Sequence, residues 1–223
     1  MIRLKQTTQR STNVMKRKNK ILITIIFMIV GMTALKFTQS EKIPDDWRLI
    51  LVNDKHAVPK NYSPQLTQLS NGIYIDSRIY SDLQKMFDDA RSDGVYPIVS
   101  EGYRTHKQQK QMMKDKITGF VNEGYSEKEA EKLAKKQVAE AGKSEHELGI
   151  ALDINADTSY SSDEEVYNWL AENAFKYGFI LRYPPDKTNI TEIDYEPWHY
   201  RYVGTDTALE IYSQQITLEE YLS

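Results

Sequence analysis

The sequence predicts an α+β protein, with a small antiparallel sheet flanked by helices and an N-terminal transmembrane helix. Short apolar segments with strand character occur along the chain without the strict alternation with helices that is typical of a parallel sheet. Capping boxes that begin with serine mark helix starts between these segments. The chain has 223 residues, of which 40% are hydrophobic and 27% charged, enough for one well-buried domain and a short appendage.

The N-terminal region has the charge pattern of a membrane anchor. Residues 1–20 contain seven basic residues and no acid, and residues 21–37 are apolar apart from Lys36. Basic segments stay on the cytoplasmic side, so the rest of the chain is expected outside the cell membrane, facing the cell wall. The apolar run is shorter than a typical span of about 20 residues, and a cleaved signal peptide is the alternative. We predict a basic cytoplasmic segment at 1–20, a single-pass anchor or signal-anchor at 21–37, a linker at 38–46 and one domain at 47–223.

Composition excludes several classes of protein and site. The chain has no cysteine, which excludes disulfides, thiolate metal sites and a lipid anchor on an N-terminal cysteine. Residues 1–40 hold eight of the 29 basic residues and no acid, which leaves 21 basic against 32 acidic residues and a formal charge of −11. We expect no nucleic-acid partner, because nucleic-acid binding depends on cations that neutralise phosphates.

The first half of the domain is predicted to contain short strands and two helices. Trp47–Val52 and Gly72–Ile75 have strand character. Ser77–Ser92 carries apolar residues at the spacing of one helical face. Tyr96–Val99 follows as a compact buried strand, and Thr105–Ile117 is predicted to be a very polar helix.

The second half opens with a predicted helix that begins at a capping box formed by Ser126 and Glu129 and ends at Gly142. The segment from Lys116 to Lys143 is rich in Lys and Glu. We interpret it as a solvated helix pair, and the alternative is a lid over a functional site. The remaining predicted elements are strands at Leu148–Ile154, Phe179–Leu181 and Trp198–Val203, and a helix with a capping box at Ser162 and Glu165 that ends at Gly178.

Two separate segments together contain the side chains of a hydrolytic metal site. Ser144–Asp153 supplies His146 and Asp153, and Glu196–His199 supplies a second imidazole and a spare carboxylate. Two imidazoles and one carboxylate are ligands that zinc accepts, and three ligands leave one position for water. A lone histidine is more often a surface or core residue. The interpretation therefore depends on both segments together.

The spacing within these segments indicates how they would meet. His146 and Asp153 are seven residues apart and would point to opposite faces of one regular strand. Gly149 offers a break, so that His146 can lie on a loop before the strand that carries Asp153. Pro197 keeps Glu196 extended, so a strand after this bend can aim its histidine at the metal. Glu196 would then lie beside the open position, act on the water as general base and return a proton to the leaving amine.

Further segments of the chain match one known family in order. The two main motifs are Ser144-x-His146-x-x-Gly149-x-Ala151-x-Asp153 and Glu196-x-Trp198-His199. Additional matches are Ser100-Glu101-Gly102-Tyr103-Arg104-Thr105, Gln108-Gln109, Arg182-Tyr183-Pro184 and His199-Tyr200-Arg201-Tyr202-Val203-Gly204. With these motifs, most of residues 47–204 resembles the zinc D-alanyl-D-alanine carboxypeptidases of the VanY type. The resemblance implies a hedgehog/D,D-peptidase-like fold, Zn²⁺ ligands at His146, Asp153 and His199, and Glu196 as the catalytic base.

The resemblance also implies residues that contact the substrate. Arg104 would steady the substrate carbonyl or carboxylate, and the planar guanidinium of arginine binds carboxylates through two parallel hydrogen bonds. Gln109 and Ser144 are further candidates for binding the terminal D-Ala. The matching motifs do not use His106, which we assign to a polar helix surface, and we expect His56 to be exposed.

Two residues depart from the family pattern. Glu101 places an extra acid next to Arg104, and Glu192 stands where a small residue is expected in the turn after Thr191. Neither residue replaces a predicted ligand. The expected chemistry is therefore retained, while the range of substrates is left open.

The predicted function is hydrolysis of the terminal D-Ala-D-Ala bond of peptidoglycan stem peptides or their precursors by a zinc-dependent D,D-carboxypeptidase. Such an activity would remove the ends to which glycopeptide antibiotics bind, and so contribute to resistance. The alternatives are an L,D-carboxypeptidase acting on tetrapeptide stems and a non-catalytic module that binds cell-wall peptides. Glu196 argues against the binding module, which has no need for a base.

Overall fold

The computed structural model describes residues 46–223. The predicted cytoplasmic segment at 1–20 and the predicted anchor at 21–37 lie outside these residues, as does the linker except for its last residue. No helix between residues 46 and 223 is both long enough and apolar enough to cross a membrane. The predicted α+β architecture with antiparallel pairing is confirmed for this part of the chain.

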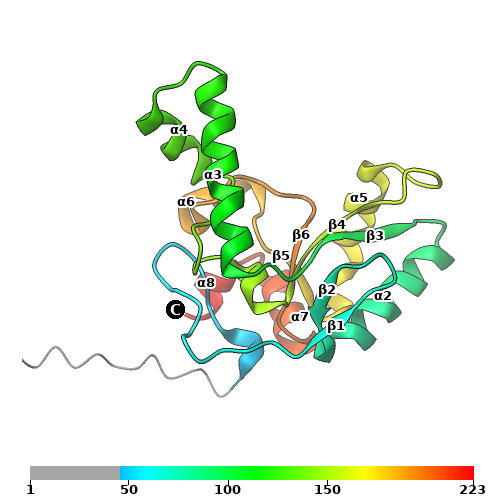
Figure 1. The fold of residues 1–223 in the computed structure, drawn as a ribbon. Helices are drawn as coiled ribbons and strands as arrows, with labels where there is room; N and C mark the ends of the chain where they lie inside the picture. Colours follow the sequence, from blue (N-terminus) through cyan, green and yellow to red (C-terminus); the bar gives the residue numbers. More distant parts are fainter. Residues whose placement is uncertain (1–45) are drawn as a thin grey trace, which may run out of the picture. The chain divides into compact units, whose positions relative to one another are not determined.

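A four-stranded antiparallel sheet lies at the centre of the domain (Figure 1). Its strands, in spatial order, are β3 (Pro97–Glu101), β4 (Ala151–Ala156), β6 (His199–Tyr202) and β5 (Phe179–Leu181). A separate hairpin pairs β1 (Leu66–Gln68), which was not predicted, with β2 (Tyr74–Asp76). Strands β2 to β6 correspond to predicted strands, with shifts of a few residues at their ends.

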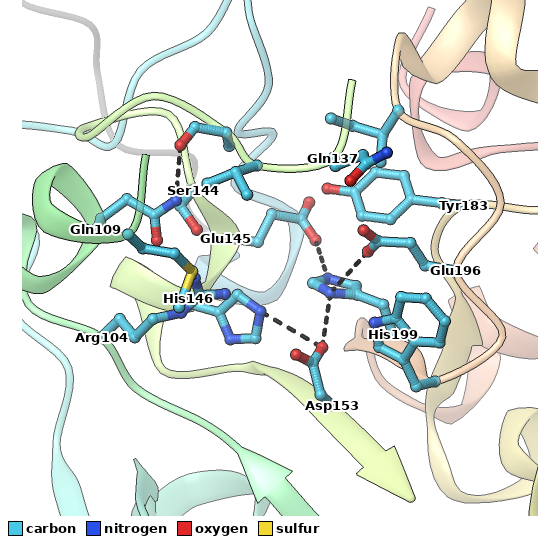
Figure 2. A pocket seen from close by; sticks show the side chains of 15 residues that line it. Arg104, Gln109, Gln137, Ser144, Glu145, His146, Asp153, Tyr183, Glu196 and His199 are labelled. Atoms are coloured by element: carbon cyan, nitrogen blue, oxygen red, sulfur yellow. Dashed lines mark hydrogen bonds and ion pairs between the residues drawn. The ribbon is translucent and has the colours of Figure 1, made fainter. Parts of the chain in front are cut away.

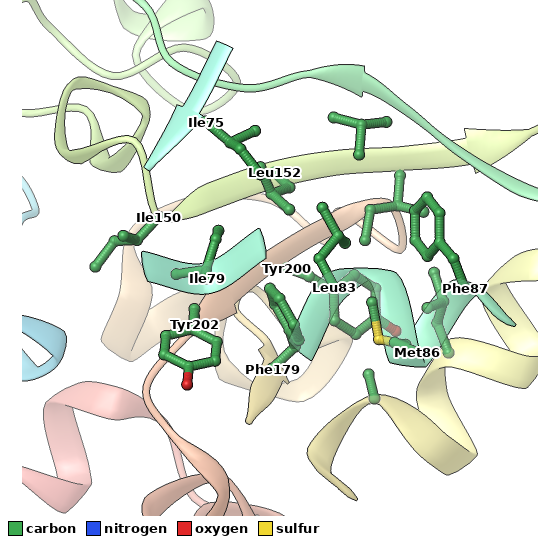
Figure 3. Packing of buried hydrophobic residues seen from close by; sticks show 14 of the residues in the cluster. Ile75, Ile79, Leu83, Met86, Phe87, Ile150, Leu152, Phe179, Tyr200 and Tyr202 are labelled. Atoms are coloured by element: carbon green, nitrogen blue, oxygen red, sulfur yellow. The ribbon is translucent and has the colours of Figure 1, made fainter. Parts of the chain in front are cut away.

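Side-chain alternation gives the sheet an apolar face and a polar face. Leu152 of β4 and Tyr200 of β6 belong to the main hydrophobic core, together with the buried side of α2 (Tyr80–Ser92) (Figure 3). Neighbouring residues on a strand point to opposite faces. Asp153 and His199 therefore project from the other face of the sheet, away from this core.

Capping boxes start several of the helices. The boxes predicted at Ser126 and Ser162 are both formed, and Thr105 and Thr217 form two more. Helix α3 is the polar helix predicted at Thr105–Ile117 and runs on to Asn122, whereas α4 ends at Ala134, short of the predicted end at Gly142. The two helices extend away from the sheet (Figure 1). The helices besides α2 are α3 (His106–Asn122), α4 (Glu127–Ala134), α5 (Asp163–Asn173), α6 (Thr188–Thr191), α7 (Thr205–Gln214) and α8 (Leu218–Tyr221). Short 3-10 turns are η1 (Trp47–Leu49), η2 (Ser77–Ile79), η3 (Glu145–Leu148), η4 (Ala174–Tyr177) and η5 (Pro185–Lys187).

The strand predicted at Trp47–Val52 is wrong. These residues form η1 and then an extended segment that joins neither of the two described sheets. Its apolar side chains pack alternately against two hydrophobic clusters, which explains the strand-like pattern. The carbonyl oxygens of Arg48 and Ile50 accept hydrogen bonds from Nη2 of Arg201 at 2.8 and 2.9 Å. A buried side chain thus takes the place of a neighbouring strand.

Candidate metal centre and active site

Three elements bring His146, Asp153 and His199 together. His146 lies on η3, Asp153 on β4 and His199 on β6. One potential ligand atom from each residue lies within 4.8 Å of the other two (Figure 2). Oδ1 of Asp153 is 3.5 Å from Nε2 of His146 and 3.0 Å from Nδ1 of His199. The predicted ligand set therefore converges on one point.

Local backbone geometry produces this convergence. Gly149 ends η3 with a φ of +74°, a conformation that other residues rarely adopt, and so turns the chain from His146 into β4. Asp153 and His199 are directly paired in the antiparallel register of β4 and β6. The break predicted at Gly149 is confirmed.

The hydrogen bonds around the three residues fit a bound cation. Nδ1 of His146 is 2.8 Å from the carbonyl oxygen of Gly102, which can only accept, so this nitrogen donates and leaves Nε2 free as a ligand. Oδ1 of Asp153 and Nε2 of His199 are buried without a hydrogen-bond partner. Buried polar atoms are normally paired. A bound ion, together with hydrogen-bond partners of its ligands, would supply the partners that these two atoms lack.

The His199 imidazole and the Asp153 carboxylate each favour the charged form of the other. Burial lowers the pKa of its imidazole, but the interactions with Asp153 and Glu145 outweigh burial and raise the pKa to about 9. Burial raises the pKa of the Asp153 carboxyl, and the two histidines more than compensate, so it stays well below its ordinary value. When no metal ion is bound, the protonated imidazole of His199 therefore supplies the positive charge beside the Asp153 carboxylate.

Glu196 lies beside the ligand set. A turn closed by the hydrogen bond from the His199 amide to the Glu196 carbonyl, at 3.1 Å, brings the two side chains together across Pro197. Oε2 of Glu196 is 3.6 Å from Nδ1 of His199. Burial is the main cause that raises the pKa of Glu196 to about 7. A carboxylate that gains and loses a proton near neutral pH suits general acid–base chemistry.

Arg104 presents a buried guanidinium to the same pocket. The pocket has a volume of about 170 Å³, and the three candidate ligands and Glu196 also line it. Arg104 is only 8% exposed, and burial lowers its pKa. Its Nη1 donates to the sulfur of Met112, its Nε has no partner, and it forms no ion pair with any residue from 46 to 223. A buried cation without a counter-ion is suited to an anionic ligand.

Gln109 and Ser144 are both buried and line this pocket. Nε2 of Gln109 donates to the carbonyl oxygen of Ala139 at 2.6 Å, while its Oε1 has no partner. The amide thus ties α3 to the segment that follows α4, residues of which form one wall of the pocket. The contact of Gln109 and Ser144 with substrate stays a prediction.

The other two histidines lie at exposed positions, as predicted. His106 is the first residue of α3 and approaches Glu147 at 3.2 Å, and His56 is exposed in an early loop. Sequence reasoning missed Tyr183 and Glu145, which both line the pocket and are both buried. Tyr183 belongs to the matched Arg182-Tyr183-Pro184 motif, but the motif assigned it no role. Glu145 stands between the matched residues Ser144 and His146, and nothing in the sequence distinguishes a buried acid from a solvated one.

A family model described as VanY, D-alanyl-D-alanine carboxypeptidase, matches residues 72–205. The chain belongs to this family. A D-alanyl-D-alanine carboxypeptidase from Enterococcus faecalis is 53% identical over 178 residues, which cover 80% of this chain. The match covers 66% of that relative, just under two thirds of its length.

Solved structures of VanY proteins agree with this assignment. VanYB in complex with D-alanine-D-alanine superimposes with a TM-score of 0.78 at 53% identity, covering 79% of this chain and 98% of that one. A mutant VanY D,D-pentapeptidase from a VanB-type vancomycin resistance cassette, in complex with Zn(II), gives 0.79 at 53% identity, with 80% and 100% covered. The LdcB LD-carboxypeptidase gives 0.65 at 35% identity, with 77% and 84% covered.

Proposed function

We propose that this protein is a zinc-dependent D,D-carboxypeptidase that hydrolyses the terminal D-Ala-D-Ala bond of peptidoglycan stem peptides or their precursors. The observation that carries the proposal is the convergence of His146, Asp153 and His199 beside the carboxyl of Glu196. The VanY structures that contain Zn(II) or D-alanine-D-alanine support the choice of metal and substrate.

The candidate ligands and Glu196 have separate roles in the reaction. His146, Asp153 and His199 would hold the ion, which would supply Lewis acidity toward the water and the scissile carbonyl. Glu196 accepts a proton from the water as the water oxygen bonds to the carbonyl carbon. When the C–N bond breaks, Glu196 returns that proton to the amine of the departing D-Ala. A pKa near 7 lets the same group take up and release a proton at neutral pH.

Arg104 supplies the positive charge for the substrate. Its buried guanidinium has no ion-pair partner within residues 46–223, so a carboxylate or a developing oxyanion in the pocket satisfies it. A carboxypeptidase must recognise a free terminal carboxylate, and an arginine in a low-dielectric pocket does so more strongly than one in water.

The cellular setting is part of the proposal. The basic residues of segment 1–20 followed by the apolar run at 21–37 support a single-pass anchor with the enzyme domain outside the membrane, facing the wall. There the domain meets stem peptides that end in D-Ala. The relative from a vancomycin resistance cassette supports a role in glycopeptide resistance.

L,D-carboxypeptidase activity is the second candidate, because the likeness to LdcB favours it as well. The ligands and Glu196 act on the scissile carbonyl and do not sense the neighbouring stereocentre, so they do not separate the two activities.

The deciding experiment measures D-Ala released by the purified full-length chain from a pentapeptide ending in D-Ala-D-Ala and from a tetrapeptide ending in D-Ala. We expect release from the pentapeptide, loss of release with a chelator and recovery with added Zn²⁺. Glu196→Gln should be inactive, while Glu192→Gln, at an exposed position, should keep activity. Release from the tetrapeptide alone would establish the L,D reaction, and turnover that a chelator does not affect would contradict the zinc mechanism.

A further inference from the structure

We propose that Glu145 is a positioning residue that orients His199 for metal binding, and that Glu219 on the C-terminal helix α8 supports it through Arg182. The inference rests on the proposed function only in that His199 is taken as a zinc ligand. It assigns the buried charges of Glu145, Arg182 and Glu219 a role in holding a zinc ligand in place.

The two oxygens of the Glu145 carboxylate have different surroundings. The side chain is fully buried, and Oε1 accepts hydrogen bonds from Nε of Arg182 at 2.9 Å and from Nη1 of Arg201 at 2.8 Å. Oε2 has no hydrogen-bond partner and lies 3.9 Å from Nε2 of His199, which has none either (Figure 2). Two buried, unpaired atoms of complementary character therefore face each other.

That arrangement selects one tautomer of His199. Nδ1 is the nitrogen that faces Asp153, at 3.0 Å, so Nδ1 must be free of its proton to bind the ion. The proton then resides on Nε2, where a carboxylate oxygen is the appropriate acceptor. His146 uses the opposite arrangement, with Nδ1 directed at a backbone carbonyl and Nε2 toward the ion. Each imidazole thus has its own outer partner.

The Glu145 carboxylate is held rigidly because its two arginines are themselves held. Arg182 donates to both oxygens of Glu219, at 2.8 and 2.6 Å. Arg201 uses its other nitrogens on the carbonyl oxygens of Arg48, Ile50 and Tyr202. Both arginine side chains are fully buried. Partners on three separate segments thus hold the two arginines, and the arginines hold Oε1 of Glu145.

Glu145→Gln tests the proposal because it keeps the shape and removes the charge. The amide has a single acceptor oxygen for the donors of Arg182, Arg201 and His199, so at least one donor faces an NH₂ group. Competition of the full-length chain with a chromogenic chelator measures Zn²⁺ affinity, and outer-partner substitutions typically weaken binding about 10- to 100-fold. We expect a loss in that range for Glu145→Gln and a smaller loss for Glu219→Gln.

Glu147→Gln is the matched control. Glu147 is a second buried acid on η3, but its oxygens contact the Gly142 amide and His106 and neither metal-facing imidazole. We expect its Zn²⁺ affinity to stay within about threefold of the unmodified chain, below the range of outer-partner effects. Nitrogen-15 NMR of the zinc-loaded protein gives a second readout: His199 should carry its proton on Nε2, with a signal that shifts in Glu145→Gln and not in Glu147→Gln.

The outcomes separate this inference from the proposed function. If Glu145→Gln folds and binds Zn²⁺ as tightly as the unmodified chain, the positioning role is overturned, whatever the peptidase activity. If Glu145→Gln does not fold, Glu219→Gln decides, because Glu219 lies at the edge of the network and is partly exposed. Unchanged Zn²⁺ affinity and an unchanged His199 signal in Glu219→Gln would then overturn the proposal. An unmodified chain that binds Zn²⁺ but releases no D-Ala contradicts only the proposed function. One that binds no Zn²⁺ overturns both.

Discussion

Asp153 and His199 are directly opposite each other on β4 and β6, with Oδ1 of the aspartate 3.0 Å from Nδ1 of the histidine. The hydrogen-bonded ladder between two central strands therefore fixes the separation of two candidate ligands before any ion arrives. These two ligand positions are therefore preorganised by the sheet, whereas His146 is placed separately by η3 and the turn at Gly149.

The first prediction concerns this pair. Asp153→Asn removes the only anionic ligand while keeping the side-chain volume, so Zn²⁺ affinity should fall by more than the roughly 10- to 100-fold that outer partners contribute. Because the ladder itself is made by backbone groups, the far-UV circular dichroism spectrum should be unchanged. Equilibrium dialysis against Zn²⁺ measures the loss, and an affinity equal to that of the unmodified chain would remove Asp153 from the ligand set.

The second prediction concerns Glu196 as the base. Glu196→Gln should lower kcat by about 10²- to 10⁴-fold while the protein still binds Zn²⁺. In the unmodified enzyme the base must be deprotonated, so kcat/KM should rise with pH along an acidic limb. The pKa of about 7 in the metal-free protein sets the upper limit of that limb, because a nearby dication lowers a carboxyl pKa. Steady-state rates from pH 5 to 9 report the limb, which should be absent from the residual activity of Glu196→Gln.

The third prediction follows from the pKa of about 9 for His199 in the metal-free protein. The imidazole is protonated at pH 7 and must lose that proton to bind an ion, so Zn²⁺ affinity should increase about tenfold per pH unit between pH 7 and 9. Calorimetry in buffers of different ionisation enthalpy counts the released protons. The folded-state pKa is above the ordinary value of 6.5, so His199 stabilises the metal-free fold below about pH 6.5 and loses that contribution as pH rises through 9. Binding that releases no proton at pH 7 would contradict this assignment.

The fourth prediction concerns Gly102, whose carbonyl oxygen orients His146. A Cβ at this position would collide with the carbonyl oxygen of Tyr74 and lie 2.8 Å from Cγ2 of Ile73. Gly102→Ala should therefore cost about 1–3 kcal/mol of unfolding free energy and weaken Zn²⁺ binding by displacing the acceptor for Nδ1 of His146. Gly119→Ala, on the open side of α3 with nothing within 4 Å of the added Cβ, is the control and should stabilise by about 0.5–1 kcal/mol. Equal Tm shifts in the two variants would refute the steric argument.

The fifth prediction concerns Glu192, which occupies a left-handed conformation with a φ of +63°. The small residue expected there from the family pattern is what this backbone favours. Glu192→Gly should be about 1–2 kcal/mol more stable than Glu192→Ala, since both lose the exposed ion pair with Lys55 and only glycine avoids the strain. Chemical denaturation of the two variants measures the difference, and an alanine variant at least as stable would contradict it.

Elements defined by local signals were predicted well. Phe179–Leu181 was placed correctly because three apolar residues stand between Gly178 and a charged residue, and the box at Ser162 correctly placed the start of α5. Trp47–Val52 failed because two of its carbonyl oxygens, those of Arg48 and Ile50, accept from Arg201, about 150 residues away, and not from a neighbouring strand. A pattern of apolar residues records burial but not which donor supplies the hydrogen bonds.

The residues of the candidate site also fall into two groups, those that the sequence alone indicates and those that it does not. His146, Asp153, His199 and Glu196 were recognisable because their types and spacing match one chemistry. The role of Glu145 was not, because it depends on complete burial and on two arginines from other segments. Charge alone predicts a solvated surface, so a buried ionic network is invisible in one sequence.

The stretch that contains α3 and α4 begins just after Arg104 and ends just before Ser144. Residues of α3 and of the segment after α4 contribute to the pocket wall, but none of them is a candidate ligand. Replacing this stretch would remodel that wall of the pocket while leaving the candidate ligands and Glu196 in place. One contiguous stretch of about 40 residues could therefore be grafted as a unit to change this wall, because every candidate ligand lies outside it.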